Sequence, residues 1–276
     1  MDGVESELIR EIVGVGEHVA LTRWASAIAL TIFVWDNLLT LGDEVYFIWP
    51  KKWSSVKVCT YGNRILCFVA LVLNTLQLDT THRNFTYEFC AAYFHIAGYF
   101  AYASFALCNW ILLVRAHALL GGKRNHFVWL CSLFAVAYAG TAVLVVIATL
   151  GLQSQLYYSD VFKACGIREL PYLMPFLWIP AGIFETIVFT ITVTKVYRSF
   201  QLSRCLGSDL FMVLYRDGVA YYLVIIILRG ANILSWLFLP ASYAFAGLFI
   251  LFSVMSVSMT RLQLNLMKSA HLPLGR

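Results

Sequence analysis

Seven long apolar runs, separated by short polar connections, limit what this chain can fold into more than any other feature of its sequence. Each run is long enough to cross about 30 Å of hydrocarbon as a helix that rises about 1.5 Å per residue. Only 13% of the 276 residues are charged, whereas a soluble domain carries about 25%. We therefore predict an all-α membrane protein with a seven-transmembrane helix bundle. The predicted spans are Leu21–Leu41, Thr60–Leu78, Tyr87–Leu113, His126–Leu150, Tyr172–Tyr197, Gly218–Leu239 and Tyr243–Leu262.

The polar residues divide the chain into one transmembrane domain between two short tails. Residues 1–20 form an acidic tail, residues 21–263 hold the seven spans, and residues 264–276 form a basic tail. The first tail lacks the basic segment that opens a cleavable signal peptide, so we expect the first span to remain as an anchor. The net charge of +5 is spread over separate loops. This pattern argues against nucleic acid as a partner and makes the lipid bilayer the expected one.

The distribution of lysine and arginine predicts how the bundle lies in its membrane. The positive-inside rule places the side with more of these residues in the cytoplasm, so we expect the N-terminus outside and the C-terminus in the cytoplasm. We expect a multi-pass protein of the plasma membrane or the endomembrane system. The basic side holds Lys51, Lys52, Lys57, Arg64, Arg115, Lys123, Arg124, Lys195, Arg198, Arg204, Arg216, Arg261, Lys268 and Arg276, and the other side holds Arg10, Arg23, Arg83, Lys163 and Arg168.

Two features on the predicted outer side agree with this orientation. Asn84 begins the only Asn-x-Ser/Thr motif of the chain and is a candidate glycosylation site. Of the seven cysteines, only Cys90 and Cys165 fall on this side, where conditions are oxidising. We predict a disulfide between them, which would tie the loop after the fourth span to the third span and contribute a few kcal/mol. The alternative is two unpaired thiols.

Four ionisable side chains lie inside predicted spans, where they are costly and mark candidate functional positions. Asp36 and Arg64 lie at similar depths in the first and second spans, so we predict that they pair. Glu185 and Arg229 lie closer to the middle of the fifth and sixth spans and form a second predicted pair. Each pair is either a switch or ligand site, or a structural pair that fixes helix register. For Asp36 and Arg64 we favour the structural interpretation.

We predict a ligand pocket between the third, fifth and sixth spans, beneath the loop that holds Cys165. Its candidate residues are His95, Glu185 and Arg229. Pro175 and Pro180 should bend the fifth span because each removes a backbone donor. The sequence contains no motif for a metal, a phosphate group or a nucleophilic serine. We therefore predict no metal site, no cofactor and no catalytic residue.

The stretch from Trp35 to Arg64 carries a resemblance to a known family. It reads W-D-N-L-L-T-L-G-D-E-V, then I-W-P-K-K-W-S, with Lys57 and Asn63-Arg64 behind them. This resembles the N-terminal signature, over about residues 20–65, of a large group of multi-pass membrane proteins from mushroom-forming fungi. That group is known only as a domain of unknown function. The resemblance implies a seven-helix membrane protein from a fungus, and it implies no activity.

Three functions are compatible with these features. A receptor-like sensor with an outward-facing site for a small-molecule ligand is the first, by analogy of architecture with G-protein-coupled receptors. Coupling to a G protein is doubtful, because the third span ends in Val114-Arg115-Ala116-His117 instead of D-R-Y and N-P-x-x-Y is absent. A transporter of small molecules or ions is the alternative, although the sequence shows no internal repeat. A membrane-embedded enzyme is the second alternative, and we find no acid or histidine cluster for it.

Overall fold

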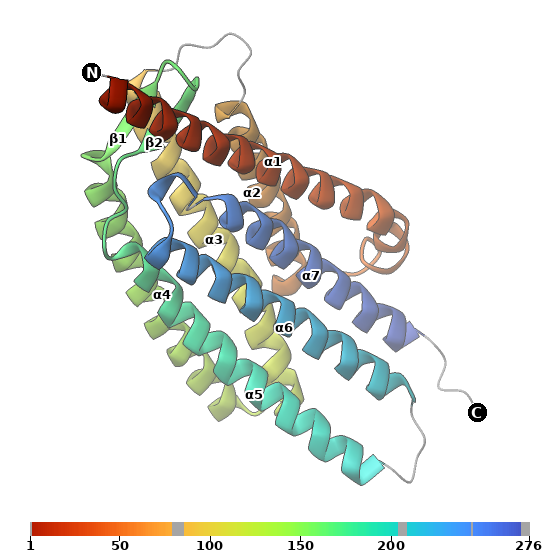
Figure 1. Cartoon of the computed structure of the whole chain (residues 1–276). Coiled ribbons are helices and arrows are strands. Elements are labelled where there is room, and N and C mark those ends of the chain that lie inside the picture. Colours follow the sequence, from red (N-terminus) through yellow and green to blue (C-terminus); the bar gives the residue numbers. More distant parts are fainter. Residues whose placement is uncertain (1, 79–85, 204–208, 244, 272–276) are drawn as a thin grey trace.

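The computed structural model describes residues 2–78, 86–203, 209–243 and 245–271. Asn84, the candidate glycosylation site, lies outside these residues. The described chain is helical apart from one short hairpin and two 3₁₀ turns (Figure 1). The helices are α1 (Asp2–Phe47), α2 (Ser55–Gln77), α3 (Tyr87–Leu119), α4 (Arg124–Gln153), α5 (Trp178–Ser203), α6 (Asp209–Phe238) and α7 (Ala246–His271), and the other elements are β1 (Leu156–Ser159), β2 (Ala164–Ile167), η1 (Met174–Leu177) and η2 (Ala241–Tyr243).

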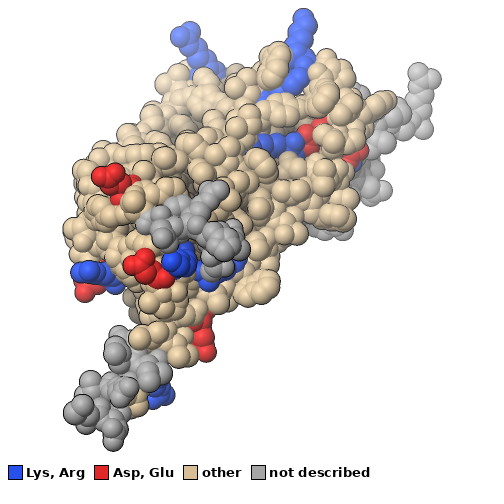
Figure 2. Space-filling view, turned by 90° about the horizontal axis from the view of Figure 1, so that it is seen from above, with Lys and Arg blue, Asp and Glu red and all other residues tan. Residues whose placement is uncertain are grey.

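Within the described residues, seven helices are long and apolar enough to cross a membrane. Large apolar side chains such as Trp24, Val136 and Ile227 are exposed on the outside of these helices, as expected of a surface that faces hydrocarbon. Seen from the side of α1, most of the surface carries no charged side chain (Figure 2). The chain is therefore a multi-pass integral membrane protein.

The helices form a closed ring in chain order, because each packs on the next and α7 packs extensively on α1 (Figure 1). α3 also contacts α5 and α7 across the ring. The β1–β2 hairpin marks one end of the bundle, which we name the hairpin end. The α1–α2 and α3–α4 connections mark the other, which we name the loop end.

Helix boundaries follow from local capping chemistry. Ser54 lies in extended backbone, and its side chain accepts a hydrogen bond of 3.3 Å from the Lys57 amide, so α2 begins five residues before the predicted span. Thr86 caps α3 in the same way through the Phe89 amide. Gly121 and Gly122 follow the end of α3 with positive φ angles of 84° and 67°, which glycine adopts without steric cost.

Two helices differ from the sequence expectation. α1 starts at Asp2, so the segment predicted as an N-terminal tail continues the first spanning helix without a break. Its 46 residues reach about 69 Å, well beyond the thickness of a bilayer. In the fifth span, Pro175 lies in η1 and Pro180 in the first turn of α5. Proline is tolerated there because the first amides of a helix have no intrahelical acceptor. The two prolines thus lie at the start of the span, in η1 and the first turn of α5, and not inside the helix where we expected them to bend it.

Candidate functional site

A mostly apolar cavity of about 130 Å³ lies inside the bundle, between its middle and the hairpin end. All helices except α1 contribute to its lining, together with η1. Small residues of α3 open the space on one side, and aromatic rings of α3, α4, α5 and α6 close it on others. An apolar cavity with a few polar groups is the usual form of a small-molecule site. Residues that define it include Gly98, Ala101, Phe105, Tyr138, Trp178 and Trp236.

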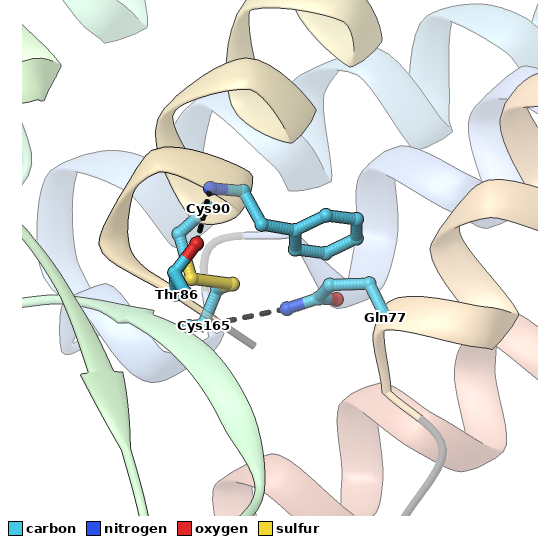
Figure 3. Close-up of a disulfide and its surroundings, with 5 residues drawn as sticks. Gln77, Thr86, Cys90 and Cys165 are labelled. Atoms are coloured by element: carbon cyan, nitrogen blue, oxygen red, sulfur yellow. Dashed lines mark hydrogen bonds between the residues drawn. A yellow bond between two sulfur atoms is a disulfide. The ribbon is translucent and has the colours of Figure 1, made fainter. Parts of the chain in front are cut away.

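The predicted disulfide between Cys90 and Cys165 is present, and it fastens the hairpin to the start of α3 (Figure 3). Gln77 at the end of α2 points toward the same bond, and its Nε2 donates a hydrogen bond of 3.3 Å to the Cys165 carbonyl oxygen. Leu156 and Ile167 of the hairpin belong to the same buried core as the cavity lining. The hairpin therefore covers the core at this end and is held there from two helices.

A second, smaller cavity of about 70 Å³ lies beneath the hairpin, between α1, α2, α3 and α7. It shares four lining residues with the central cavity, so the two are adjacent along the bundle axis. The shared residues are Tyr93, Phe94, Phe245 and Phe249. Arg23 of α1 fixes this region, since its Nε donates a hydrogen bond of 2.8 Å to the Leu78 carbonyl oxygen and its Nη2 donates to that of Phe162.

Glu185 and Arg229 form the predicted ion pair, and both side chains are buried. Nη2 of Arg229 lies 2.7 Å from Oε1 of Glu185. Nδ2 of Asn109 on α3 donates a second hydrogen bond of 2.7 Å to the same oxygen. Both charged residues lie near the middle of their spans, which run over Met174–Lys195 and Tyr221–Phe238. The cost of burying the carboxylate is thus offset by one charge and one amide donor.

Aromatic rings enclose the Arg229 guanidinium. Its carbon lies 5.4 Å from the centre of the Trp178 ring and 5.7 Å from that of Phe105, within the range of cation–π attraction. Among the described residues, no acceptor is within hydrogen-bond distance of Arg229 Nε or Trp178 Nε1, although both atoms are buried. An unpaired buried donor is costly, so these two N–H groups are available to an acceptor from outside the chain.

The ion pair lies between the central cavity and a third cavity nearer the loop end. Arg229 lines the central cavity, while Glu185 lines the third, which has a volume of about 280 Å³. α3, α5, α6 and α7 surround this third cavity, and Arg115 is one of its polar residues. Arg115 donates a hydrogen bond of 2.6 Å to the Leu262 carbonyl oxygen. A change in the geometry of the Glu185–Arg229 pair would therefore alter the lining of both cavities.

His95 does not line the central cavity, which corrects its prediction as a pocket residue. Its Nε2 lies 2.7 Å from Nε2 of Gln153 on α4, and its ring stacks on Tyr99. α3 turns His95 toward α4 and the outside, while Phe94 and Gly98 face the cavity. The sequence placed His95 at the right depth, but an almost uniformly apolar α3 gives no periodicity from which to choose a face.

The predicted pairing of Asp36 with Arg64 is wrong. Arg64 pairs with Glu44, which lies about two helical turns beyond Asp36 toward the loop end of α1. Asp36 pairs instead with Arg261 of α7. Both acids are buried. The reason is that α1 packs more extensively on α7 than on α2, so Asp36 faces the seventh helix. The long side chain of Arg64 reaches toward the loop end instead of sideways.

These two pairs belong to a polar cluster that joins α1, α2 and α7, which we name the three-helix clasp. Asn63 donates a hydrogen bond of 2.9 Å to the Ser256 hydroxyl, and Ser104 of α3 donates to the Asn63 side-chain oxygen. Lys268 lies 2.6 Å from Asp43 at the edge of the cluster. Further members are Thr40, Thr60, Thr260 and Gln263.

The loop after α1 and the start of α2 hold three of the lysines that were counted on the basic side. Lys51 and Lys52 are exposed, but Lys57 is buried. Its Nζ donates to the Trp49 and Lys51 carbonyl oxygens at 3.1 and 2.9 Å and lies 4.9 Å from the Trp53 ring centre. Lys57 thus closes the loop from inside, because its ammonium group satisfies carbonyl groups that the turn leaves free.

Comparison with known proteins adds one similarity. Residues 24–69 match a family of unknown function (DUF6533). These residues cover the second half of α1, its loop and about two thirds of α2, and they include Asp36, Glu44 and Arg64 of the three-helix clasp. No curated protein matches the chain. The match agrees with the resemblance to a family of unknown function, while the fungal source stays a prediction.

Several residues of these clusters were missed by the sequence analysis. Asn109 and Trp178 lie in apolar runs where nothing marks them as neighbours of an ion pair. Glu44 was hidden by the expectation that the first span ends at Leu41. No cluster of three or more histidines, cysteines or acids that could hold a metal occurs in the described part of the chain. The predicted absence of a cofactor stays a prediction.

Proposed function

We propose that this protein is a receptor-like sensor that binds a small, mostly apolar molecule in the central cavity. The position of the buried Glu185–Arg229 pair supports this function, because its two members line different cavities at successive levels of the bundle. A ligand that contacts Arg229 changes the interaction between the Arg229 guanidinium and the Glu185 carboxylate. Because Glu185 lines the third cavity, the packing of α3, α5, α6 and α7 toward the loop end responds.

The proposal includes an orientation and a size limit. We place the hairpin end outside, because the disulfide belongs to an oxidising compartment and exposed Lys51 and Lys52 lie at the loop end. The cavity of about 130 Å³ is close to the engineered apolar cavity of about 150 Å³ that holds benzene. The ligand is therefore of the size of a substituted benzene or a short-chain molecule. The role is binding, without catalysis.

A binding measurement tests this function. Purified protein in nanodiscs is titrated with 4-fluoroacetophenone, and bound probe is followed by ¹⁹F NMR. Ala101→Leu fills part of the central cavity and should weaken binding by about tenfold or more, which corresponds to about 1.4 kcal/mol. Ala139→Leu is the matched control, because Ala139 is exposed on the outer side of α4. Equal affinities of the two variants would contradict a ligand site in this cavity.

Transport is the second candidate, and one observation favours it. Three cavities among the described residues follow one another along the bundle, with shared aromatic residues between the first two and the ion pair between the last two. A transporter needs such a series of sites across the membrane. Proteoliposomes loaded with 4-fluoroacetophenone distinguish the two functions poorly, since the probe crosses lipid, so the charged 4-fluorobenzoate is used. Flux above that of protein-free liposomes would favour transport.

A further inference from the structure

A groove of about 400 Å³ opens on the outer surface between α5 and α6. Exposed isoleucines, among them Ile179, Ile183 and Ile226, line it. Because both helices are long and apolar enough to span a membrane, this groove faces hydrocarbon. Gly182 and Gly230 also line it, and their missing side chains leave space between the two helices.

The groove and the central cavity share their wall. Among the described residues, only Trp178 and Arg229 line both spaces, so these two side chains separate the groove from the cavity. Glu185 is also part of the groove. A charged pair near the middle of two spans is expensive on a lipid-facing surface. The free-energy cost of this pair at the inner side of an open groove is lower if a polar group of a ligand reaches it there.

The wall between the two spaces presents donors without acceptors. Nε of Arg229 and Nε1 of Trp178 are buried and have no hydrogen-bond partner within the described residues. Both residues are more than nine-tenths buried. The Arg229 guanidinium lies over the face of the Trp178 ring, so the two donors belong to adjacent groups. The missing partner is therefore an acceptor, and a carbonyl or carboxylate oxygen is the kind that accepts without needing a partner for a hydrogen of its own.

We infer that an apolar ligand with one carbonyl or carboxylate oxygen reaches the central cavity sideways from the bilayer, through the α5–α6 groove and past Arg229 and Trp178. The ligand dissolves first in hydrocarbon, and its oxygen accepts from the unpaired N–H groups as it passes or when it has bound. This inference rests on the proposed function, because it concerns the route to the same cavity and the class of ligand.

The competing route runs along the bundle axis from the hairpin end. It would pass through the cavity of about 70 Å³ beneath the hairpin, whose lining includes Val19 of α1. The disulfide and the Gln77 hydrogen bond hold the hairpin over this route. Blocking one route and leaving the other open separates the two possibilities.

Gly230→Leu blocks the groove and leaves the cavity unchanged. A Cβ atom at Gly230 meets no heavy atom within 4 Å, so the substitution adds bulk to open space in the groove. Gly140→Leu is the matched control, since Gly140 of α4 is exposed and its Cβ would also meet nothing within 4 Å. Val19→Phe narrows the axial route instead.

The experiment measures association and dissociation rates of 4-fluoroacetophenone by ¹⁹F exchange NMR in nanodiscs. Gly230→Leu should slow both rates by about tenfold, while Kd stays within about twofold, because a blocked path raises a barrier without changing either end state. Gly140→Leu and Val19→Phe should leave both rates as in the unmodified protein. 1-Ethyl-4-fluorobenzene, which has the same ring and no oxygen, should bind about tenfold more weakly.

The outcomes separate the route from the site. Unchanged rates in Gly230→Leu, or slower rates in Val19→Phe alone, would overturn the sideways route while leaving the binding function in place. Equal affinity for the two probes would overturn the assignment of an oxygen acceptor. If neither probe binds the unmodified protein, the proposed function fails and the route fails with it.

Discussion

Arg229 donates a 2.7 Å hydrogen bond from Nη2 to Oε1 of Glu185, and this contact joins α6 to α5. Asn109 of α3 donates to the same carboxylate oxygen. Three helices therefore meet on one atom near the middle of the spans. The atom lies between two cavities, which makes the contact a candidate for transmitting a ligand signal as well as for holding the helices in register.

Removing one member of this pair should be more harmful than removing both. Arg229→Gln leaves the buried Glu185 carboxylate without its counter-charge, and we expect a loss of about 3–5 kcal/mol in the free energy of unfolding. The double variant Arg229→Gln with Glu185→Gln buries no charge and should recover most of that loss. Unfolding in detergent with increasing dodecyl sulfate measures both. A double variant that is less stable than the single one would contradict this prediction.

The disulfide should stabilise the hairpin end through the loop that it closes. Cys90 and Cys165 are 75 residues apart, and replacing both by serine should cost about 2–5 kcal/mol, chiefly by freeing the unfolded chain. Peptide mapping under non-reducing conditions checks the bond, and thermal unfolding checks its contribution. Cys131→Ser is the control, because Cys131 is free and half-buried. Finding Cys90 and Cys165 as separate thiols would contradict the disulfide.

The three-helix clasp predicts which acid Arg64 is coupled to. In a double-mutant cycle, Glu44→Gln and Arg64→Gln should show a coupling energy of about 0.5–3 kcal/mol, since the two side chains are in contact. Asp36→Asn and Arg64→Gln should be additive, while Asp36→Asn and Arg261→Gln should be coupled. Strong coupling between Asp36 and Arg64 would restore the pairing that the sequence suggested and contradict the clasp.

Sequence reasoning succeeded where composition and depth decide the answer. Seven apolar runs predicted seven helices long enough to span a membrane, and the side on which the cysteines fall predicted the Cys90–Cys165 bond. The Glu185–Arg229 pair was also found by depth, since both lie near mid-span on helices adjacent in the chain. These inferences need only the order of the spans and their alternation across the membrane.

Sequence reasoning failed where the rotation of a helix, or a neighbour distant in the sequence, determines which residues a side chain contacts. Asp36 faces Arg261, which is 225 residues away, and no pattern in the sequence indicated that α7 packs along α1. His95 lies on the outer side of α3. The sequence could not show this, because α3 is apolar all round and its periodicity indicates no face. Trp178 became a wall of two cavities only through the helix start that Pro175 and Pro180 impose.

We propose that a ligand in the central cavity acts through the ion pair on the loop end, and amide hydrogen exchange measures this coupling. Exchange is measured with and without saturating 4-fluoroacetophenone in the unmodified protein and in the neutral double variant of Glu185 and Arg229. We expect the probe to change protection around Thr192 and Val193 of α5, which line the third cavity. The neutral variant lacks the Arg229 donor and so needs a higher probe concentration for saturation, but once saturated it should show no such change. The same change in both proteins, or no change in the unmodified protein despite saturation, would show that the ion pair does not couple the two cavities.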